Sequence, residues 1–478
     1  MEYNPLSSMT KKTKLTKIVA TIGPASDTAE IMSELIDAGV NVFRFNTKHS
    51  TPDWHDEHIK LAQQVADSKG AVIGILLDLQ GPEIRLETRD KVEVPVKNGE
   101  EIKIGASFID DIDVIIPHAA VFSLLKPGDD LFIDDGFVET TVVSTHENYL
   151  ITKVKNDAVI KHRKGVNLPG IDIDFPSLID NDIAQIEKNA RNKVDYVGLS
   201  FVRTAADIRL LRLEMQQRGM DAQIVAKIEN QVALNHIDEI IAEADLVMVA
   251  RGDLGIETAI EQLAYWQETI IRKCRLAGKP VITATQMLES MIVNPRPTRA
   301  EATDVANAIY DGTDAIMLSA ETAGGKYPVR TVQTMSRIAA WNEANRPVEQ
   351  LSFQDNTATS VITKSAVSIA KSNIEPAIDH IIVFTETGHT VRFLSRYRQS
   401  VPVIAITGDK KVAESLAVSF GVTPFVTNYH EPFFTTPDKV LNELVETGLI
   451  KKGENVVIVH GSQWQKAGLT NALQITLV

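Results

Sequence analysis

Short apolar segments alternate with amphipathic ones along most of this chain. Residues 18–22, 41–46 and 71–78 are apolar and end at Gly, Pro or polar residues, which is typical of buried strands. The stretches between them carry apolar residues at the i, i+3 and i+4 spacing of a helix. The order strand, helix, strand, helix, strand predicts the beginning of a parallel sheet.

The alternation stops over residues 87–170 and then resumes. The interrupting stretch has short strand-like runs, many turns and little helical periodicity, which predicts an inserted small β-barrel lid that ends in the hinge-like segment KHRKGVNLPG. After it, five more strands separated by helices are predicted at VDYVGLSF, QIVAKIE, LVMVARG, PVITATQ and DAIMLSA. Eight such units close a (β/α)8 TIM barrel, although an open sheet would show the same alternation.

The composition changes again near residue 346, where a linker to about residue 357 leads into a further α/β unit. Its expected strands are HIIVFTE, VPVIAIT and ENVVIVHG, and it is too short for a second barrel, so an open sheet is predicted. We therefore expect a tail (residues 1–15), a barrel (16–86 and 171–346), the inserted lid (87–170) and a C-terminal open-sheet α/β domain (347–478).

Composition and charge narrow the classes of protein. The 478 residues suit about two to four domains, and 44% hydrophobic with 23% charged residues is ordinary for a globular protein. The net charge of −14 argues against a nucleic-acid or anionic-membrane partner, and no apolar run reaches the roughly 18 residues of a spanning helix. The single cysteine, Cys274, lies in a helical pattern and fits a reducing compartment, so we expect a cytoplasmic protein.

Charged residues follow two neighbouring predicted strands within residues 224–254. Lys227 and Glu229 close the first strand, and Arg251 and Asp253 close the second. The carboxyl ends of barrel strands open on one face, so Glu229 and Asp253 are expected side by side as hard oxygen ligands for Mg²⁺. Lys227 should point to the same side as Glu229. Surface ion pairs are the simpler interpretation of each residue alone, but the four together favour a site.

A series of motifs resembles the pyruvate kinase family. They are TKIVATIGPAS, GPEIR, IDDG, KGVNLPG, AKIEN, VARGDLG, ITATQMLESM, NPRPTRAEATDVANAIYDGTDAIMLSAETA and LSRYR. The resemblance covers nearly the whole chain in the family's order, including the β insertion. It implies phosphoryl transfer from phosphoenolpyruvate to ADP, giving pyruvate and ATP, with Mg²⁺ or Mn²⁺ as cofactor. It also implies a homotetramer whose C-terminal domain is regulatory.

The resemblance implies roles for individual residues. Glu229 and Asp253 match the divalent-metal ligands, and Lys227 matches the cation that stabilises the transferring phosphoryl group and the enolate. Arg44 matches the arginine on the substrate phosphate, and Thr285 matches the threonine implicated in protonating the enolate carbon. The other matches are Gly252, which with Asp253 offers backbone N–H groups to the substrate carboxylate, and, in the nucleotide-phosphate region, Arg85, Lys164 and His49.

These residue types suit the implied reaction. Phosphoryl transfer spreads negative charge over oxygens, and a metal on two carboxylates with a lysine and an arginine stabilises it. The Thr285 hydroxyl is too weak an acid to act alone, so we expect it to relay a proton through water. The simpler interpretation of Thr285 is a strand-end hydroxyl bonded to the backbone. A salt bridge from Arg44 to Asp78 is also expected.

The chain departs from the family at the monovalent-cation site. Members commonly hold K⁺ with an Asn-x-Ser motif and an Asp-Thr pair; here Asn46 and Asp78 are kept, but Lys48 and Leu79 replace the Ser and Thr. Members that dispense with K⁺ resemble one another in having Lys where this chain has Glu83. A lysine ammonium is a compact point charge. Our hypothesis is that Lys48 is a tethered surrogate for K⁺. In the alternative, Lys48 points to solvent or pairs with Glu83 while a cation binds with fewer ligands.

A polar turn between a predicted strand and helix matches the family's effector loop. Its N–H groups open a helix and suit a phosphate, with Arg392 nearby, so a sugar monophosphate or bisphosphate is the expected effector. An ordinary capped helix start explains the turn equally well. Residues 461–471 resemble the second effector loop loosely. The residues expected to bind the effector are Thr385, Thr387, Gly388, His389 and Thr390.

Two other functions fit parts of the pattern. A metal-dependent lyase acting on pyruvate enolate would share the carboxylate pair, but it has no reason to carry the lid or KGVNLPG. A catalytically silent sensor is opposed by intact Lys227, Glu229, Asp253 and Thr285.

Overall fold

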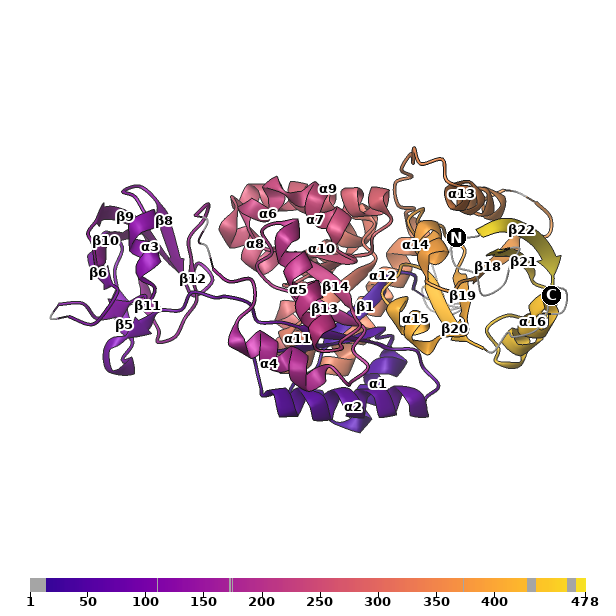
Figure 1. The fold of residues 1–478 in the computed structure, drawn as a ribbon, viewed down its shortest axis with the longest axis horizontal. Coiled ribbons are helices and arrows are strands. Elements are labelled where there is room, and N and C mark those ends of the chain that lie inside the picture. The colour runs from indigo at the N-terminus through magenta and orange to yellow at the C-terminus, as the bar shows by residue number, and fades with distance from the viewer. Residues whose placement is uncertain are drawn as a thin grey trace, which may run out of the picture.

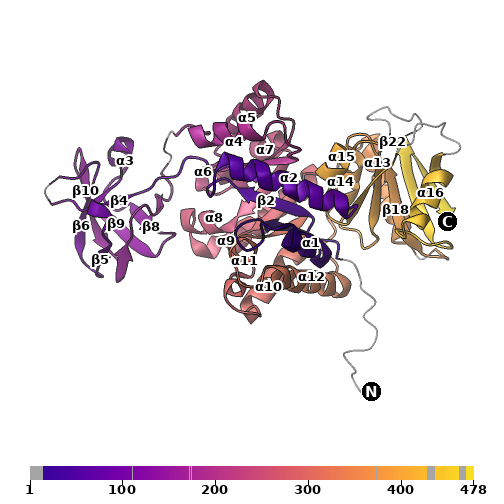
Figure 2. The same cartoon turned by 90° about the horizontal axis from the view of Figure 1, so that it is seen from below.

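Three units lie in a row along the molecule (Figure 1), and the view from below shows the same order (Figure 2). The computed structural model describes residues 14–109, 111–171, 173, 175–372, 374–427, 436–461 and 470–478. A β module stands at one end, a barrel lies in the middle, and an α/β unit stands at the other end. Within those ranges, no helix combines the length and the apolar content needed to cross a membrane.

The middle unit is a closed barrel of parallel strands in the order β1-β17-β16-β15-β14-β13-β3-β2. The strands are β1 (Lys17–Thr21), β2 (Val42–Asn46), β3 (Gly74–Asp78), β13 (Tyr196–Leu199), β14 (Gln223–Ile228), β15 (Leu246–Ala250), β16 (Val281–Ala284) and β17 (Ala315–Leu318). Most are buried along their whole length, which explains their continuous apolar sequences. The predicted TIM barrel is therefore confirmed, and the open-sheet alternative is wrong.

Helices surround the barrel and begin and end at residues suited to those positions. In α10 (Arg299–Asp311), the Thr298 side chain accepts from the Glu301 backbone N–H while Glu301 bonds back to Thr298. Gly312 ends this helix with φ 85°, a left-handed conformation that suits glycine. The other helices of this unit are α1 (Ala29–Ala38), α2 (Pro52–Ser68), α4 (Asp180–Asn189), α5 (Ala205–Gln217), α6 (Gln231–Asn235), α7 (Ile237–Glu243), α8 (Arg251–Glu257), α9 (Leu263–Ala277), α11 (Ala320–Ala323) and α12 (Pro328–Asn345).

The insertion is a β module with its own hydrophobic core. Seven strands form one sheet in the order β12-β8-β9-β10-β6-β7-β4, and β11 pairs with β5. A β-bridge between Arg85 and Gly165 joins the two segments that connect the insertion to the barrel, and these segments form its hinge. The elements are β4 (Glu87–Thr88), β5 (Val94–Val96), β6 (Glu101–Gly105), β7 (Val114–Ile115), α3 (Ala119–Leu124), β8 (Asp130–Ile133), β9 (Val138–Thr145), β10 (Tyr149–Val154), β11 (Ala158–Ile160) and β12 (Val166–Asn167).

The C-terminal unit is the predicted open sheet, with strand order β20-β19-β18-β21-β22. Its elements are α13 (Ala358–Ala370), β18 (Ile378–Phe384), α14 (His389–Ser395), β19 (Val403–Thr407), α15 (Lys410–Ser415), β20 (Val422–Val426), α16 (Thr436–Glu446), β21 (Asn455–Gly461) and β22 (Thr470–Leu477). The sequence analysis missed β20, α16 and β22. Helix α14 ends at Ser395, and Arg398 beyond it takes a positive φ of 49°.

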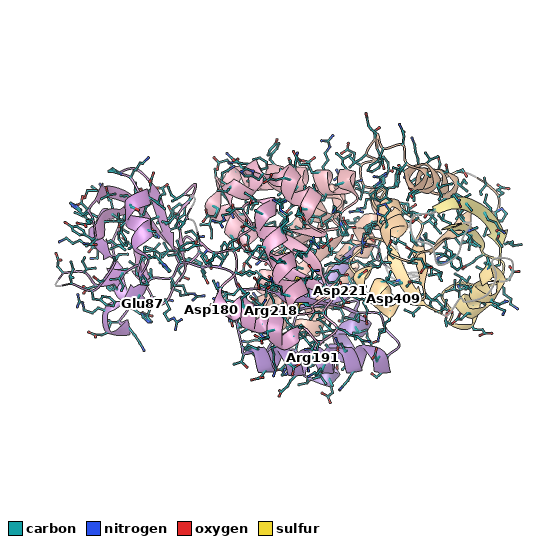
Figure 3. The ribbon with its side chains drawn as sticks, viewed as in Figure 1. Glu87, Asp180, Arg191, Arg218, Asp221 and Asp409 are labelled. Carbon is teal, nitrogen blue, oxygen red and sulfur yellow. The ribbon has the colours of Figure 1, made fainter. Side chains whose placement is uncertain are left out.

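The amino ends of the barrel strands face the C-terminal unit. Lys17 at the start of β1 donates to the Val422 carbonyl at 2.6 Å, and Lys411 pairs with Asp221 across the same seam. Figure 3 labels Asp221 and Asp409 on the two sides of this seam. The carboxyl ends of the strands therefore open toward the β module, the face on which barrel active sites lie.

Candidate active site

Lys227 is the central cation at the barrel mouth. Its ammonium lies 2.9 Å from Glu229 Oε1 and 3.4 Å from Asp78 Oδ1, and it donates to Ser200 Oγ at 2.7 Å. Burial alone would lower the pKa of Lys227, but the Asp78 and Glu229 carboxylates raise it above its ordinary value. Lys227 therefore stays charged at neutral pH and presents a fixed positive charge inside the mouth.

Arg44 supplies a second buried cation. Its Nε donates to Asp78 Oδ2 at 2.6 Å and its Nη1 donates to Thr21 Oγ1 at 2.9 Å, so the expected Arg44–Asp78 salt bridge is present. Asp78 is buried, which would raise its pKa, but Lys227 and Arg44 lower it below the ordinary value. Asp78 thus stays ionised and positions both cations. The close approach needs Gly198 on β13, because a Cβ there would lie 2.8 Å from Asp78 Oδ1.

Glu229 directly follows β14, and Asp253 lies in the first turn of α8. The two carboxylates are close enough to interact electrostatically, as the sequence predicts. Glu229 is buried and accepts from the Phe201 N–H at 2.6 Å. Burial and the nearby Glu229 charge raise the pKa of Asp253 to about 7. Two carboxylates that repel each other in a buried site fit a bound dication, whose charge would relieve the repulsion. No larger group of acidic, His or Cys ligands occurs among the described residues, so other metal ligands would come from substrate and water.

Thr285 sits in a strained backbone beyond β16. Its φ is 70°, a left-handed value that is costly for a β-branched residue. Its hydroxyl donates to the Ala284 carbonyl and accepts from the Gly252 N–H at 2.7 Å. The buried Arg251 guanidinium holds this turn by donating to the carbonyls of Thr285 at 2.6 Å and Ala284 at 3.2 Å. The bonds to the backbone are those of the simpler interpretation, and they place Thr285 beside Gly252.

The three residues expected in the nucleotide region surround the lid hinge. Arg85 pairs with Glu83 at 2.7 Å and donates to the Arg163 carbonyl, and Lys164 pairs with Asp134 at 2.7 Å. His49 is exposed, and partial desolvation together with the charges of Lys48, Arg44 and Arg85 lowers its pKa. The cations Arg85 and Lys164 therefore lie on the two segments that join barrel and lid.

Lys48 forms an ion pair with Glu83 at 2.9 Å. This contact is the one that the alternative interpretation of Lys48 describes. Its backbone N–H also donates to Asn46 Oδ1 at 3.2 Å, and the Leu79 carbonyl accepts from Ser200. The charge of Lys48 lowers the pKa of Asp253, so it acts electrostatically on the centre of the site.

Two residues of the site escaped the sequence analysis. Ser200 accepts from Lys227 and donates to the Leu79 carbonyl at 2.6 Å, so it connects β14 to β3. Phe201 has φ 53°, and its N–H holds Glu229. Both are the last residues of the predicted strand VDYVGLSF and directly follow β13, and that position at a strand end was the available signal.

A cavity of about 930 Å³, its opening to solvent included, lies between the hinge and the barrel mouth. Asp253 and Glu83 line its polar side, and Phe201, Ile173 and Phe175 line its apolar side. The site therefore has room for a substrate beneath the lid.

The predicted effector loop lies at the carboxyl end of β18. Thr385 is buried and its Oγ1 accepts from the Gly388 N–H at 2.9 Å, while Thr387 and His389 are exposed. Thr390 bonds to Thr470. The second predicted effector loop falls largely on residues 462–469, which lie outside the described residues.

The fold and the site define a class of protein: a (β/α)8-barrel enzyme that acts on an anionic substrate beneath a hinged lid. The family model "Pyruvate kinase, barrel domain" matches residues 13–332, and "Pyruvate kinase, alpha/beta domain" matches residues 360–476. The chain belongs to the pyruvate kinase family, whose members transfer the phosphoryl group of phosphoenolpyruvate to ADP and release pyruvate.

Individual relatives agree along almost the entire chain. A pyruvate kinase of Bacillus licheniformis is 39% identical over 97% of this chain and 80% of its own length. A pyruvate kinase of Clostridium acetobutylicum is 39% identical over 97% of this chain and 99% of its own. A crystal structure of a pyruvate kinase from Cryptosporidium parvum matches with a TM-score of 0.90 and 34% identity, covering 98% of this chain and 96% of that one.

Proposed function

We propose that Lys227 and Arg44 carry the phosphoryl transfer of this enzyme. The observation that supports this most strongly is that Asp78 lies 2.6 Å from Arg44 and 3.4 Å from Lys227, so one buried carboxylate positions both cations. Arg44 binds the phosphate of phosphoenolpyruvate, and Lys227 stabilises the charge on the transferring group and on the enolate left behind. Arg85, Lys164 and His49 hold the phosphates of ADP. Preorganised charges of this kind act where charge develops in the transition state.

Glu229 and Asp253 would hold a divalent cation, Mg²⁺ or Mn²⁺. When bound, it would neutralise the substrate's negative charge and polarise its oxygens. The protein's own part is to orient the carboxylates, which the Lys227 ammonium and the Phe201 N–H do for Glu229. The N–H groups of Gly252 and Asp253 orient the substrate carboxylate, for which the Gly252 N–H exchanges its bond to Thr285 Oγ1.

Thr285 assists the protonation of the enolate carbon. Its hydroxyl already donates to the Ala284 carbonyl, so a proton that reaches the enolate comes from a water that Thr285 orients. The hydroxyl group then positions the donor and does not itself change its protonation state.

The test is pyruvate formation from phosphoenolpyruvate and ADP with Mg²⁺, with the Lys227→Met variant as control. Turnover by the wild type and its loss in the variant support the proposal. Cleavage of a C–C bond to pyruvate without ADP would favour the lyase. Binding of phosphoenolpyruvate without turnover would favour the sensor.

For the monovalent cation, we propose that Lys48 stands in for K⁺. Its charge reaches Asp253, which supports a role in the site, while its ion pair with Glu83 is the contact that the alternative describes. The proposal predicts full activity without K⁺ and a new K⁺ requirement in Lys48→Ser. If that variant is equally active with and without KCl, the surrogate idea is wrong. Activity of the wild type only with KCl would mean that the enzyme depends on K⁺, as the presence of Glu83 in place of the lysine of K⁺-independent members indicates.

The same proposal extends to organisation and regulation. We assign residues 16–86 and 171–346 to the catalytic domain, 87–170 to the lid and 347–478 to the regulatory domain. A sugar phosphate would bind the turn at residues 385–390, and saturation curves that no sugar phosphate shifts would exclude it. A cytoplasmic homotetramer is proposed. The strand β22 exposes Ile475 and Leu477 at a sheet edge, which suits self-association. Light scattering would measure the mass of the assembly.

A further inference from the structure

A cluster of cations surrounds a hollow at the seam between the barrel floor and the C-terminal unit. The hollow measures about 190 Å³ with its open mouth included. The barrel contributes the end of α9 and the start of β17, and the C-terminal unit contributes α14 and the turns that follow α14 and α15. The charged residues that line it are Arg275, Lys279, Asp314, Arg392, Arg396 and Arg398.

Two of these cations are neutralised by carboxylates. Arg398 pairs with Asp314 at 2.5 Å and donates to two backbone carbonyls, so its charge and donors are used. Arg396 pairs with Asp355 at 2.9 Å, and its buried Nε has no hydrogen-bond partner. The Arg398–Asp314 pair joins the two units, and Asp314 is the single acid that lines the hollow.

The other three cations have no carboxylate within ion-pair distance among the described residues. Arg275 donates to the Glu349 carbonyl at 2.8 Å, Lys279 donates to the Ala244 carbonyl at 2.6 Å, and Arg392 reaches only Ser415 Oγ at 3.3 Å. The Nε atoms of Arg275 and Arg392 are buried without a hydrogen-bond partner. Buried donors without partners are rare and costly, which points to a ligand or ordered water that completes them.

The electrostatics of the hollow agree with that geometry. Burial, and then the neighbouring Arg398, lower the pKa of Arg275 to about 9. Burial also lowers the pKa of Arg392 and, with the charges of Arg212 and Arg392, that of Lys279, while the Asp245 carboxylate opposes both shifts. Like charges that share a buried space destabilise one another, and an anion between them would reverse this effect.

We propose that this hollow binds a small inorganic oxyanion of the phosphate and sulfate class. Guanidinium groups offer fixed N–H forks that suit tetrahedral oxyanions, and here they converge from two units. The enclosed space is close to that of one water molecule, so even an inorganic oxyanion enters only when the flexible Lys279 at the lining shifts, and a nucleotide or sugar phosphate would need a larger rearrangement. The bound ion ties Arg275 of the barrel floor to Arg392 of the C-terminal unit.

The proposal is tested by calorimetric titration of inorganic phosphate into the full chain at constant ionic strength. Saturating phosphoenolpyruvate without ADP occupies the substrate-phosphate position at Arg44 and Lys227, and any phosphate at the open ADP-phosphate position is recognised because Arg392→Gln and Lys279→Gln leave it unchanged. The variants are Arg392→Gln, the charge-preserving Arg392→Lys, and Lys279→Gln, whose amine bonds only to backbone and whose loss should not disturb folding. Arg191→Gln is the matched control, because Arg191 is exposed on the barrel (labelled in Figure 3).

We expect one phosphate per chain, with at least tenfold weaker binding in Arg392→Gln and Lys279→Gln, a smaller loss in Arg392→Lys, and no change in Arg191→Gln. Sulfate should compete, and chloride at the same concentration should not. Unchanged binding in both Arg392→Gln and Lys279→Gln would overturn the proposal. So would displacement by equimolar chloride, or loss of binding in His389→Ala with retention in Arg392→Gln, which would place the phosphate at the 385–390 turn.

Discussion

Substitution of Gly198 tests whether the positions of the catalytic cations matter, because it disturbs those positions without removing any charge. It lies on β13 directly opposite Asp78 on β3. A Cβ at this position would lie 2.8 Å from Asp78 Oδ1 and 3.3 Å from Cγ, whereas ordinary contacts begin at 3.4 Å. Gly198→Ala therefore adds one methyl group and forces the Asp78 carboxylate to move by about 0.6 Å.

The carboxylate cannot move without affecting the cations. Oδ2 is held by Arg44 at 2.6 Å, and Oδ1 lies 3.4 Å from the Lys227 ammonium. A misplacement of 1 Å in an active site costs about 100-fold in rate, so a shift of 0.6 Å should lower kcat/KM roughly 10- to 30-fold. Overpacking of this size should also lower the free energy of unfolding by about 1–3 kcal/mol.

The assay is the rate of pyruvate formation at saturating ADP and Mg²⁺, well below the melting temperature of the variant. Gly324→Ala is the matched control, because a Cβ there meets no atom within 4 Å, and it should behave as the wild type. A folded Gly198→Ala enzyme with wild-type kcat/KM would refute the reasoning, since the Asp78 position would then not control Lys227 and Arg44.

Three further substitutions test other parts of the structure. Lys227→Met should lower kcat on the order of 10²- to 10³-fold, measured in the same assay, because it removes a fixed charge from the transition state. Thr285→Val should slow the exchange of pyruvate methyl protons in D₂O by on the order of 10²-fold and slow phosphoryl transfer less; equal losses would contradict a role in protonation. His55 is buried between Phe45 and Trp54, and burial lowers its pKa from 6.5 to about 4. The unfolded chain takes up this proton first, so wild-type stability should fall as pH drops from 6.5 toward 4, and His55→Phe should flatten that part of the Tm profile.

The barrel was predictable because its strands are buried on both sides. Continuous apolar segments such as residues 71–78 and 246–250 leave little ambiguity once helical segments separate them. In contrast, β22 was missed because it is an antiparallel strand at a sheet edge without a fully buried residue, and β20 contains Pro424 and alternates little.

The charged strand ends were predictable for a similar reason. Lys227 and Glu229 are two residues apart after an apolar strand, and the structure places them 2.9 Å apart. Ser200 and the Lys48–Glu83 pair were harder, because each depends on contacts between segments that the chain sequence does not bring together. Arg392 shows the same limit: the sequence suggested a role beside the effector turn, but its side chain reaches Ser415 and lines the seam instead.

The central claim is that one site, positioned by Asp78 and completed by Glu229 and Asp253, transfers the phosphoryl group. The most direct test compares wild-type and Glu229→Gln enzymes for pyruvate formation across a Mg²⁺ titration. The account predicts turnover by the wild type that chelator abolishes, and a Glu229→Gln enzyme that is at least 10²-fold slower and needs more Mg²⁺. A folded Glu229→Gln variant with the wild-type rate and Mg²⁺ dependence would contradict it.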